Sequence, residues 1–285
     1  MKLSIWSTYY YPLSPEEAVD RLYRNGITAS ELSDEHGLML LERSEDIYGT
    51  AEEFAAFLKE RNFEMTQGHL WLRIKICSDE TALEKLYRWV DLYEAIGIRN
   101  MVLHCDNLVG TTLTKEEKVA LNVAKLKRLA EHIRGRDVTI CLENLRPHSA
   151  EEVGLVDETA DDLLSIIEQV GSPNFGICLD TGHLNLTVKN QREFILKAGD
   201  KLKALHIADN EGARDQHMMP FTRGKVDFVE VMQALRDIGY EGLFNLEIPG
   251  ENKAPMELRD AKIAYVQACY NYLMKQAEDR SLYSI

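Results

Sequence analysis

Short runs of apolar residues recur along the chain, and several of them end abruptly at a side chain that can ionise. Five apolar or small residues in a row are typical of a strand buried on both faces, as in a parallel sheet. Four such runs, 138–143, 175–180, 202–206 and 243–247, end in Glu143, Asp180, His206 and Glu247. Because Asp and Glu are almost never fully buried without a partner, we expect polar groups or an ion at these strand ends.

Longer segments with helical periodicity separate the apolar runs. Ser14-Pro15-Glu16-Glu17 predicts a helix start, with Ser as the N-cap and Pro at the first helical position. Thr114-Lys115-Glu116-Glu117 is a second capping box, and it opens a long amphipathic segment. We expect helices over 14–25, 51–58, 79–95, 114–133, 161–170, 191–198, 226–238 and 256–274. We expect four further strands, at 3–6, 27–32, a run that ends at 69, and 100–104.

Strand and helix therefore alternate eight times, which predicts a single α/β domain folded as a closed (β/α)8 TIM barrel. We place the barrel at residues 1–275 and a C-terminal tail at 276–285. A doubly wound open sheet is the structural alternative. The chain has no G-x-G-x-x-G after its first strand and no G-x-x-x-x-G-K-[ST], so the usual nucleotide signature of that alternative is missing.

The strand-ending side chains suggest a metal site. Side chains alternate along a strand, so Cys141 shares a face with Glu143, and Cys178 shares one with Asp180. In a TIM barrel the C-terminal strand ends form the active site, which would bring the polar groups together. Any one of them alone also fits a surface, ion-pair or helix-capping role, but four strands ending this way favour one oxygen-rich site for a divalent ion, Mn²⁺, Co²⁺, Mg²⁺ or Zn²⁺. The expected metal ligands are Glu143, Asp180, His206 and Glu247.

Composition and charge restrict the partners. The 285 residues include 33 Lys and Arg against 47 Asp and Glu, a formal net charge of −14. Such a charge repels phosphate backbones and anionic lipid, which disfavours nucleic acid and membranes as partners. Five cysteines without a C-x-x-C spacing indicate a reducing compartment, and no apolar run approaches the roughly 18 residues that span a bilayer. We expect a cytoplasmic protein with a small-molecule partner, and homo-oligomer formation stays open.

Short motifs carry a resemblance to a known family. They are Leu142-Glu143-Asn144, Leu179-Asp180-Thr181-Gly182-His183, His206-Ile207-Ala208-Asp209-Asn210, Asp215-Gln216-His217 and Leu246-Glu247. With them the sequence resembles the xylose isomerase-like barrel superfamily, which holds sugar isomerases and epimerases, inositol-pathway dehydratases and endonuclease IV-type DNA repair enzymes. The motifs span the second half of the chain, and the strand–helix count extends the match to nearly all of it.

For the sugar branch, the resemblance implies that the four strand-ending residues hold one divalent ion and that Glu143 and Glu247 are also the catalytic acid and base. The metal would acidify the C–H next to the carbonyl of a ketose. One Glu would remove that proton, and the other would return one to the opposite face of the enediolate. The expected activity is a metal-dependent isomerase or epimerase of a small sugar or sugar phosphate. The substrate-binding residues implied by the resemblance are His183, His69, His104, His217 and Asp215.

Other functions of the same fold remain alternatives. An endonuclease IV-like three-zinc phosphodiesterase acting on abasic DNA would use His69, His104, Glu143, Asp180, His183, His206, Asp215, His217 and Glu247. The chain departs from that pattern at Leu145-Arg146-Pro147, where repair enzymes continue with small Gly-rich residues, and at Gly182, where they usually carry Cys. Dehydration of a keto-inositol uses the same proton abstraction as epimerisation. A non-catalytic ligand-binding barrel is a third class.

The loop after the seventh strand departs from the sugar branch, which usually has a Pro-Gly-x-Gly turn there. Phe221 and Arg223 replace the expected glycines or small residues. Because barrels often bind phosphate in this loop, Arg223, with Lys225 or Arg214, is a candidate substrate-binding clamp for a phosphate or carboxylate. A solvated loop explains Arg223 equally well.

Aromatic residues follow the first and third strands. They are Trp6, Tyr9, Tyr10, Tyr11 and Trp71. Aromatic rings can stack on the apolar face of a sugar. An oligomer contact, or a seal over the barrel, accounts for them at least as well.

Overall fold

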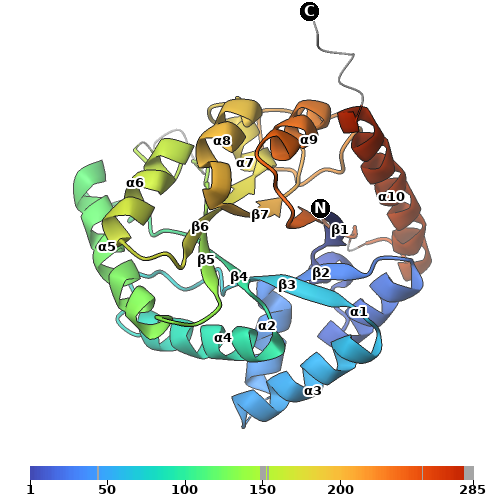
Figure 1. Ribbon diagram of the computed structural model, residues 1–285, viewed down its shortest axis with the longest axis horizontal. Helices are drawn as coiled ribbons and strands as arrows, with labels where there is room; N and C mark the ends of the chain where they lie inside the picture. The colour runs from blue at the N-terminus through green and yellow to red at the C-terminus, as the bar shows by residue number, and fades with distance from the viewer. Residues whose placement is uncertain (44, 148–151, 153, 252, 279–285) are drawn as a thin grey trace, which may run out of the picture.

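Parallel strands form the centre of the protein, and helices surround them as an outer layer (Figure 1). The computed structural model describes residues 1–43, 45–147, 152, 154–251 and 253–278. The strands are β1 (Lys2–Ile5), β2 (Ala29–Leu32), β3 (Glu64–His69), β4 (Asn100–Leu103), β5 (Thr139–Glu143), β6 (Phe175–Asp180), β7 (Leu202–His206) and β8 (Leu243–Leu246). All eight predicted strands are therefore present, each within a few residues of its expected position.

Hydrogen bonding divides the strands into two parallel ladders. One runs β2-β3-β4-β5-β6-β7, and the other pairs β1 with β8. The ladders meet between β7 and β8 through Ile207, whose N–H donates to the Asn245 carbonyl at 2.7 Å. Between β1 and β2, the Ser30 hydroxyl donates to the Ile5 carbonyl at 2.6 Å. These contacts close the predicted TIM barrel, which confirms the fold class.

The helices follow the strands in the predicted alternation. They are α1 (Pro15–Arg24), α2 (Asp34–Glu42), α3 (Ile47–Glu60), α4 (Ala82–Ile96), α5 (Lys115–His132), α6 (Ala160–Val170), α7 (Thr181–Leu186), α8 (Gln191–Ala198), α9 (Phe228–Asp237) and α10 (Met256–Glu278), with short 3-10 turns at Ser7–Tyr10 and Gly199–Lys201. Both predicted capping boxes form, Ser14 with Glu17 at α1 and Thr114 with Glu117 at α5. The side chains satisfy backbone N–H groups that a helix start leaves unpaired.

Two helices were not predicted. One is α2, which contains Gly37, a residue that lowers helix propensity. A side chain at this position would collide with Trp89 and Tyr93 of α4, so the close packing of α2 on α4 requires glycine. The other is α7, which is only six residues long and follows β6 without a loop. A segment of that length is too short to show helical periodicity.

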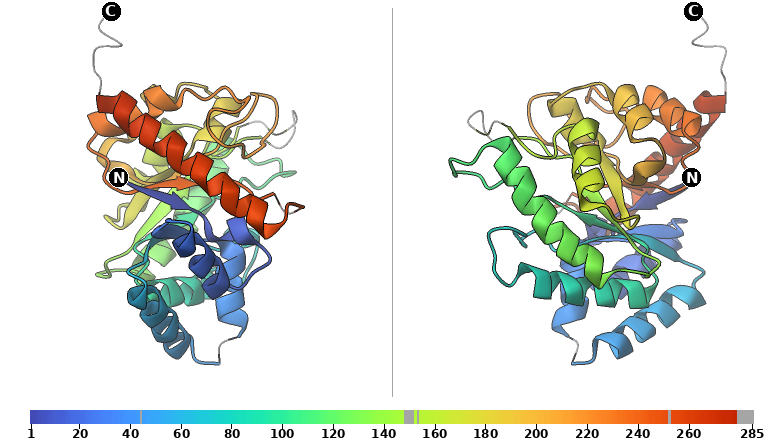
Figure 2. Two further views of the ribbon diagram at one scale, coloured as in Figure 1. Left: turned by 90° about the vertical axis from the view of Figure 1, so that its right-hand side faces the viewer. Right: turned by 60° about the vertical axis from the view of Figure 1, so that its left-hand side comes forward.

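The last helix packs along one side of the barrel beside the first strand and first helix (Figure 2). The Gln267 side chain of α10 donates to the Asn25 carbonyl at the end of α1, at 3.0 Å. The helix continues to Glu278, so it takes up the first residues of the predicted tail 276–285. The remainder of that tail, 279–285, lies outside the described residues.

Small side chains fill the interior of the barrel below the polar strand ends. Val102, Cys141, Cys178 and Ala204 form a separate, fully buried apolar cluster. Val102 pairs with Cys141 across β4 and β5, and Cys178 pairs with Ala204 across β6 and β7. Because side chains two residues apart lie on the same face of a strand, this layer lies directly beneath the ligand-type residues, as the sequence predicts.

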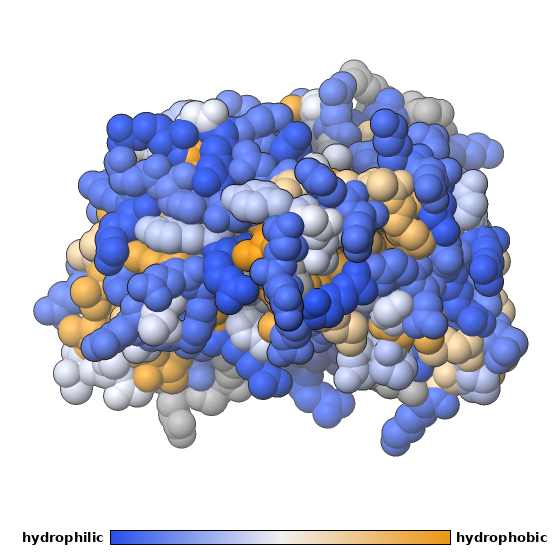
Figure 3. Space-filling view, turned by 90° about the horizontal axis from the view of Figure 1, so that it is seen from below, coloured by the Kyte–Doolittle hydropathy of each residue, from blue (hydrophilic) through white to orange (hydrophobic). Residues whose placement is uncertain are grey.

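The outer surface is mostly polar. The side of the barrel seen in Figure 3 is largely hydrophilic, with smaller hydrophobic patches between polar side chains. This agrees with a chain of net charge −14. Among the described residues, no helix combines the length and the apolar character needed to cross a membrane.

Candidate functional site

Four ligand-type side chains converge at the C-terminal end of the barrel. Glu143, Asp180 and His206 are the last residues of β5, β6 and β7, and Glu247 directly follows β8. Each offers one potential ligand atom, and these four atoms all lie within 4.8 Å of one another. The four residues are 1%, 0%, 0% and 6% exposed. The structure thus brings together the four residues that the sequence singles out.

Hydrogen bonds to the backbone hold Asp180 in this position. The side chain of Asn144 bonds both the N–H of Asp180, at 2.8 Å, and its carbonyl, at 3.0 Å. One carboxylate oxygen, Oδ1, accepts the His183 N–H at 2.7 Å and so caps α7. The capping role that the sequence leaves open therefore exists, but it occupies only one of the two carboxylate oxygens.

Three of the four residues in the cluster each have a buried polar atom without a hydrogen-bond partner. Among the described residues, Asp180 Oδ2, His206 Nδ1 and Glu247 Oε2 are buried and have no hydrogen-bond partner. The Nδ1 atom of His206 lies 3.3 Å from Glu247 Oε2 and 3.3 Å from Glu143 Oε2. Buried polar atoms are rarely left unpaired. Three carboxylates and one imidazole, with unpaired buried atoms on Asp180, His206 and Glu247, fit a divalent cation with oxygen and nitrogen ligands.

Two histidines flank Glu143 on one side of this cluster. The Nε2 atom of His104 lies 2.9 Å from Glu143 Oε2, and Nε2 of His69 lies 3.4 Å from the same oxygen. Burial alone would lower the pKa of His69, but Glu143 raises it to about 9. For His104 burial outweighs Glu143 and lowers the pKa. Two more predicted residues are thus placed at the site.

A second group lies on the other side, around Asp215. Its Oδ2 atom is 3.2 Å from Nε2 of His183, 3.2 Å from Nε2 of His217 and 3.3 Å from Nε of Arg146. Burial would raise the pKa of Asp215, but the hydrogen bonds from His183 and His217 lower it strongly. The ring of His183 also lies 3.3 Å from Glu143 Oε1, so this group joins the central cluster.

Arg223 is the one predicted substrate-binding residue that the structure places at the rim. Its side chain is 70% exposed, and its nearest acidic partner is Glu211, at 3.5 Å. It lines a groove of about 570 Å³ together with Arg214, Asp215 and His217. This groove opens beside the Asp215 group, so Arg223 would meet only the outer end of a bound molecule.

The aromatic residues that follow the first and third strands lie in different surroundings. Tyr9 and Tyr10 are fully buried and pack edge to face, so they belong to the core. Trp71 stacks on Trp89 of α4. Trp6 lies nearest the site, because its ring is parallel to that of His217 at 6.5 Å between centroids. Because His217 belongs to the Asp215 group, Trp6 is placed to border a bound molecule.

The two glutamates of the cluster have opposite electrostatic environments. Burial by itself would raise the pKa of Glu143, but His206 and His104 hold it well below its usual value. Burial raises the pKa of Glu247 to about 7, although His206 and His217 oppose the shift. Two carboxyl groups whose pKa values are pushed apart are typical of paired acid and base residues.

Two residues near the ligands were not assigned from the sequence. Asn144 follows Glu143 within a motif and fixes Asp180. Glu31 is the penultimate residue of β2, and its Oε2 atom lies 3.0 Å from Nε2 of His206. The signal for Glu31 was present, since it is an ionisable residue near the end of a predicted strand, like the four candidate ligands. The register of β2 against β3 shifts between Ala29 and Glu31. The face of the strand on which the Glu31 side chain lies was therefore not predictable from simple alternation.

A buried carboxyl group, Asp157, precedes α6 and supports the loop after β5. It is 0% exposed and accepts a hydrogen bond from the Asn107 side chain at 2.9 Å. Its carbonyl accepts the Leu145 N–H at 3.0 Å. Burial raises the pKa of Asp157 to about 7, although the bond from Asn107 opposes this. The folded protein therefore keeps a proton on Asp157 in mildly acidic solution.

Asp157 should make stability fall as pH rises. Its folded pKa of about 7 exceeds the unfolded value of about 3.9, so its contribution is fully present below pH 4 and is lost as pH rises through 7. Asp157→Asn removes this loss. From pH 5 to pH 7 the variant should gain on the order of 2 kcal/mol in unfolding free energy relative to the natural protein, measured by denaturant titration. Parallel pH profiles for the natural protein, Asp157→Asn and the exposed control Asp137→Asn would contradict this prediction.

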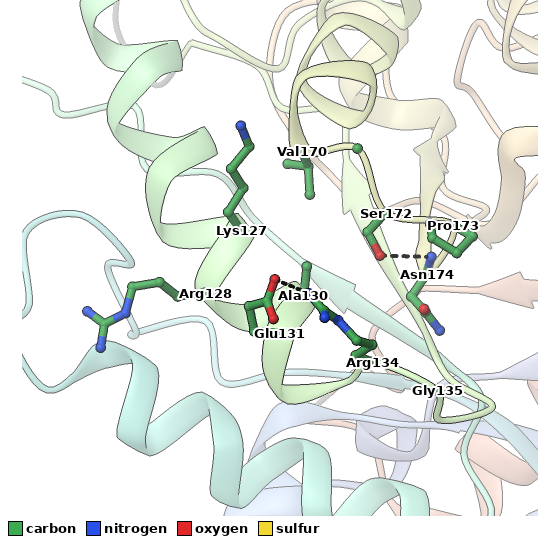
Figure 4. Close-up of a pocket in the computed structure, with 11 residues that line it drawn as sticks. Lys127, Arg128, Ala130, Glu131, Arg134, Gly135, Val170, Ser172, Pro173 and Asn174 are labelled. Carbon is green, nitrogen blue, oxygen red and sulfur yellow. Dashed lines mark hydrogen bonds and ion pairs between the residues drawn. The ribbon is translucent and has the colours of Figure 1, made fainter.

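A larger groove lies at the other end of the barrel strands. It has a volume of about 720 Å³ and lies between α5 and the turn that leads into β6 (Figure 4). Its charged lining is partly neutralised, because Glu131 pairs with Arg134. Ser172, also in the lining, accepts the Asn174 N–H at 3.3 Å. The N-terminal face of a TIM barrel serves stability, so we do not place the active site there.

Comparison with known proteins gives several relatives. The D-psicose 3-epimerase of Enterocloster bolteae is 26% identical over 215 residues, which is 71% of this chain and 68% of that protein. The probable endonuclease 4 of Ureaplasma urealyticum is 29% identical over 252 residues, 80% of this chain and 77% of that protein. For two uncharacterized relatives, the matched segments cover 59% and 42% of their length, so the chain spans about half of those proteins.

Solved structures show the same fold at lower identity. The D-psicose 3-epimerase of Clostridium cellulolyticum H10, solved with D-tagatose, superposes with a TM-score of 0.80 at 19% identity, over 96% of this chain and 99% of that one. Residues 19–269 match the family described as xylose isomerase-like TIM barrel. This match covers most of the barrel and includes all four residues of the central cluster. The chain belongs to the xylose isomerase-like TIM barrel family.

Proposed function

We propose that the protein is a divalent-metal-dependent isomerase or epimerase of a small sugar or sugar phosphate. The observation that carries the proposal is the buried cluster of Glu143, Asp180, His206 and Glu247, whose ligand atoms lie within 4.8 Å of one another. A divalent ion bound there would act as a Lewis acid and polarise the carbonyl of a ketose. Relatives named D-psicose 3-epimerase, L-ribulose 3-epimerase and fructoselysine 3-epimerase support this class of reaction.

The two glutamates would carry the proton. Without an ion, His206 and His104 hold the pKa of Glu143 well below its usual value, whereas burial raises the pKa of Glu247 to about 7. A bound divalent ion would lower both pKa values, because carboxylates bind a metal in their ionised form. One accepts the proton from the carbon next to the carbonyl, and the other donates a proton to the opposite face of the resulting enediolate. This inverts the carbon. The two residues come from β5 and the end of β8, with β6 and β7 between them in the barrel, so they approach a bound molecule from different directions.

The flanking residues would orient the substrate. His183 and His217 are held in place by Asp215, and each can exchange hydrogen bonds with sugar hydroxyl groups. His104, beside Glu143, is the more exposed of the two histidines on the other flank, with 22% of its side chain accessible. The central cluster is thus lined on both sides by polar groups suited to a polyhydroxylated molecule.

Solvent exchange tests the proposal directly. The protein, loaded with Mn²⁺, Co²⁺, Mg²⁺ or Zn²⁺, is incubated in D₂O with a panel of ketoses and ketose phosphates. We expect deuterium at the carbon next to the carbonyl and a new epimer or isomer, both absent after chelation. A product lighter by one water would instead indicate the dehydratase alternative. No exchange with any member of a broad panel would argue against sugar epimerisation.

A second candidate function is a three-metal phosphodiesterase, and a specific observation favours it. Two further groups of ligand atoms, each within 4.8 Å, flank the central cluster: His69, His104 and Glu143 on one side, and Asp180, His183 and His217 on the other. In the sequence comparison, the probable endonuclease 4 matches 80% of the chain, against 71% for the D-psicose 3-epimerase of Enterocloster bolteae. The net charge of −14 opposes DNA binding. Nicking of an abasic duplex by the zinc-loaded protein, without ketose exchange, would replace the first proposal.

A further inference from the structure

Glu31 is a fully buried carboxylate for which the proposed reaction has no direct use. It lies in β2, is 0% exposed, and its Oε2 and Oε1 atoms are 3.0 and 3.2 Å from Nε2 of His206. We infer that Glu31 is the positioning residue of the metal site. It accepts the Nε2 proton of His206 and thereby fixes the imidazole with the Nδ1 lone pair directed at the metal. This inference rests on the metal site of the proposed function.

Two buried amides surround Glu31, and each is oriented by a further partner. Asn245 donates from Nδ2 to Glu31 Oε2 at 2.8 Å, while its own Oδ1 accepts the Ser4 hydroxyl at 2.7 Å. Gln67 donates from Nε2 to Glu31 Oε2, and the same Nε2 lies 3.2 Å from the Leu205 carbonyl. A hydroxyl donor fixes the first amide and a carbonyl acceptor fixes the second. Both amides therefore present N–H groups to Glu31, not oxygen atoms.

This arrangement determines which atom of His206 carries a proton. A carboxylate has only acceptor sites, about four in number, and here it faces N–H donors from two amides. The third neighbour of the Glu31 carboxylate is Nε2 of His206, and it can bond this acceptor only by donating a proton. The tautomer of a metal-binding histidine is set by the hydrogen bond that its other nitrogen makes. With Nε2 protonated, Nδ1 is left with its lone pair.

The position of Nδ1 agrees with that assignment when a cation is bound, because a lone pair and carboxylate oxygens can face one another across a positive charge. Among the described residues it has no hydrogen-bond partner, and it lies 3.3 Å from one carboxylate oxygen each of Glu143 and Glu247. Glu31 is on the far side of the ring and takes no part in this cluster. The imidazole thus bridges a buried carboxylate on one side and the ligand cluster on the other, as in the carboxylate–histidine–metal arrangement.

The burial of Glu31 indicates that its carboxylate has a specific role, because an apolar residue would occupy this position at a lower cost in free energy. A buried carboxylate is costly unless hydrogen bonds or a nearby positive charge offset its desolvation. The network around it, Ser4, Gln67, His206 and Asn245, is at most 1% exposed. These residues come from β1, β3, β7 and β8, so Glu31 joins the two ladders of the barrel where β1 and β2 do not pair.

The test is the metal affinity of Glu31→Gln. A glutamine places an NH₂ group among three N–H donors, so His206 loses its acceptor or turns to the other tautomer, which removes the lone pair from Nδ1. We expect the dissociation constant for Mn²⁺ or Zn²⁺, measured by competition with a chromogenic chelator, to rise by about 10- to 100-fold. Saturating metal should restore most of the lost activity.

Asp209→Asn is the matched control. Asp209 is a carboxylate of the same barrel end, 2% exposed, and its Oδ1 accepts three backbone N–H groups at 2.8 to 3.0 Å. It contacts none of the four ligands in the hydrogen bonds and ion pairs of the described chain, so its metal affinity should match that of the natural protein. If Glu31→Gln does not fold, Glu31→Asp is the second variant. It keeps the negative charge but has one methylene fewer, so the carboxylate lies farther from His206, and we again expect the dissociation constant for the metal to rise.

Histidine NMR gives a readout independent of activity. In the Zn²⁺-loaded natural protein, two-bond ¹H–¹⁵N correlations of His206, assigned with His206→Ala, should show a protonated Nε2 and a metal-bound Nδ1. A metal-bound Nε2, or a folded Glu31 variant with unchanged metal affinity, would overturn the role of Glu31. A natural protein that binds no divalent ion would instead remove the proposed function, so the two failures are distinguishable.

Discussion

Replacing either glutamate of the cluster should abolish nearly all turnover. At saturating metal, Glu247→Gln and Glu143→Gln are each expected to lower kcat by about 10²- to 10⁴-fold, because each loses one positioned acid or base. Glutamine keeps the size of the side chain and an oxygen for the metal, so the fold should be retained. Initial rates with a confirmed ketose substrate measure the effect. Glu241→Gln, an exposed substitution just before β8, is the control and should keep full activity.

Solvent exchange distinguishes a two-base scheme from simple loss of the site. Each single variant keeps one base, so it should still exchange the substrate proton of one epimer with solvent while failing to invert it. Glu143→Gln and Glu247→Gln should then exchange opposite epimers. Near-natural epimerisation by either variant would show that its glutamate is not a catalytic base.

Metal binding should have the second largest effect, on thermal stability. Without an ion, Glu143, Asp180 and Glu247 are buried carboxylates within 4.8 Å of one another and of His206. A ligand that binds only the folded state stabilises it by about 4 kcal/mol when its free concentration is about 1,000 times Kd. For a domain of this size we therefore expect Tm to rise by roughly 10 °C on saturation, measured by calorimetry with and without chelator.

His206→Ala separates this effect from weak surface binding. The variant should lose the metal-dependent rise in Tm, because it lacks the one nitrogen ligand of the cluster. His132→Ala is the matched control: His132 pairs with Asp91 on the outer helices, and its variant should keep the rise. An equal rise in both variants would mean that the ion binds elsewhere.

The fold and the central cluster were predictable because both depend on the burial of parallel strands on both faces. Parallel strands buried on both faces require continuous apolar runs. An Asp or Glu that is buried at the end of such a run needs a partner, so these residues mark a candidate site. Cys141 and Cys178 lie two residues before Glu143 and Asp180, so alternation alone placed small residues under the polar ends. The helix starts were visible because capping boxes are local interactions.

What the sequence did not predict depends on contacts between distant segments. Gly37 disfavours a helix locally, yet α2 forms because Trp89 and Tyr93 of α4 pack where a side chain would lie. The role of Glu31 depends on a register shift in β2 and on His206, 175 residues away. The resemblance named Asp215 and His217 as substrate residues, but only the folded loop shows that one carboxylate holds both His183 and His217.

The number of metal ions per chain tests the central claim most directly. Elemental analysis of the purified protein, after reconstitution and removal of excess ion, gives this number and the identity of the metal. We expect close to one Mn, Co, Mg or Zn per chain, lost in His206→Ala. Close to three zinc ions would favour the phosphodiesterase, and no bound metal under any condition would contradict the proposed function.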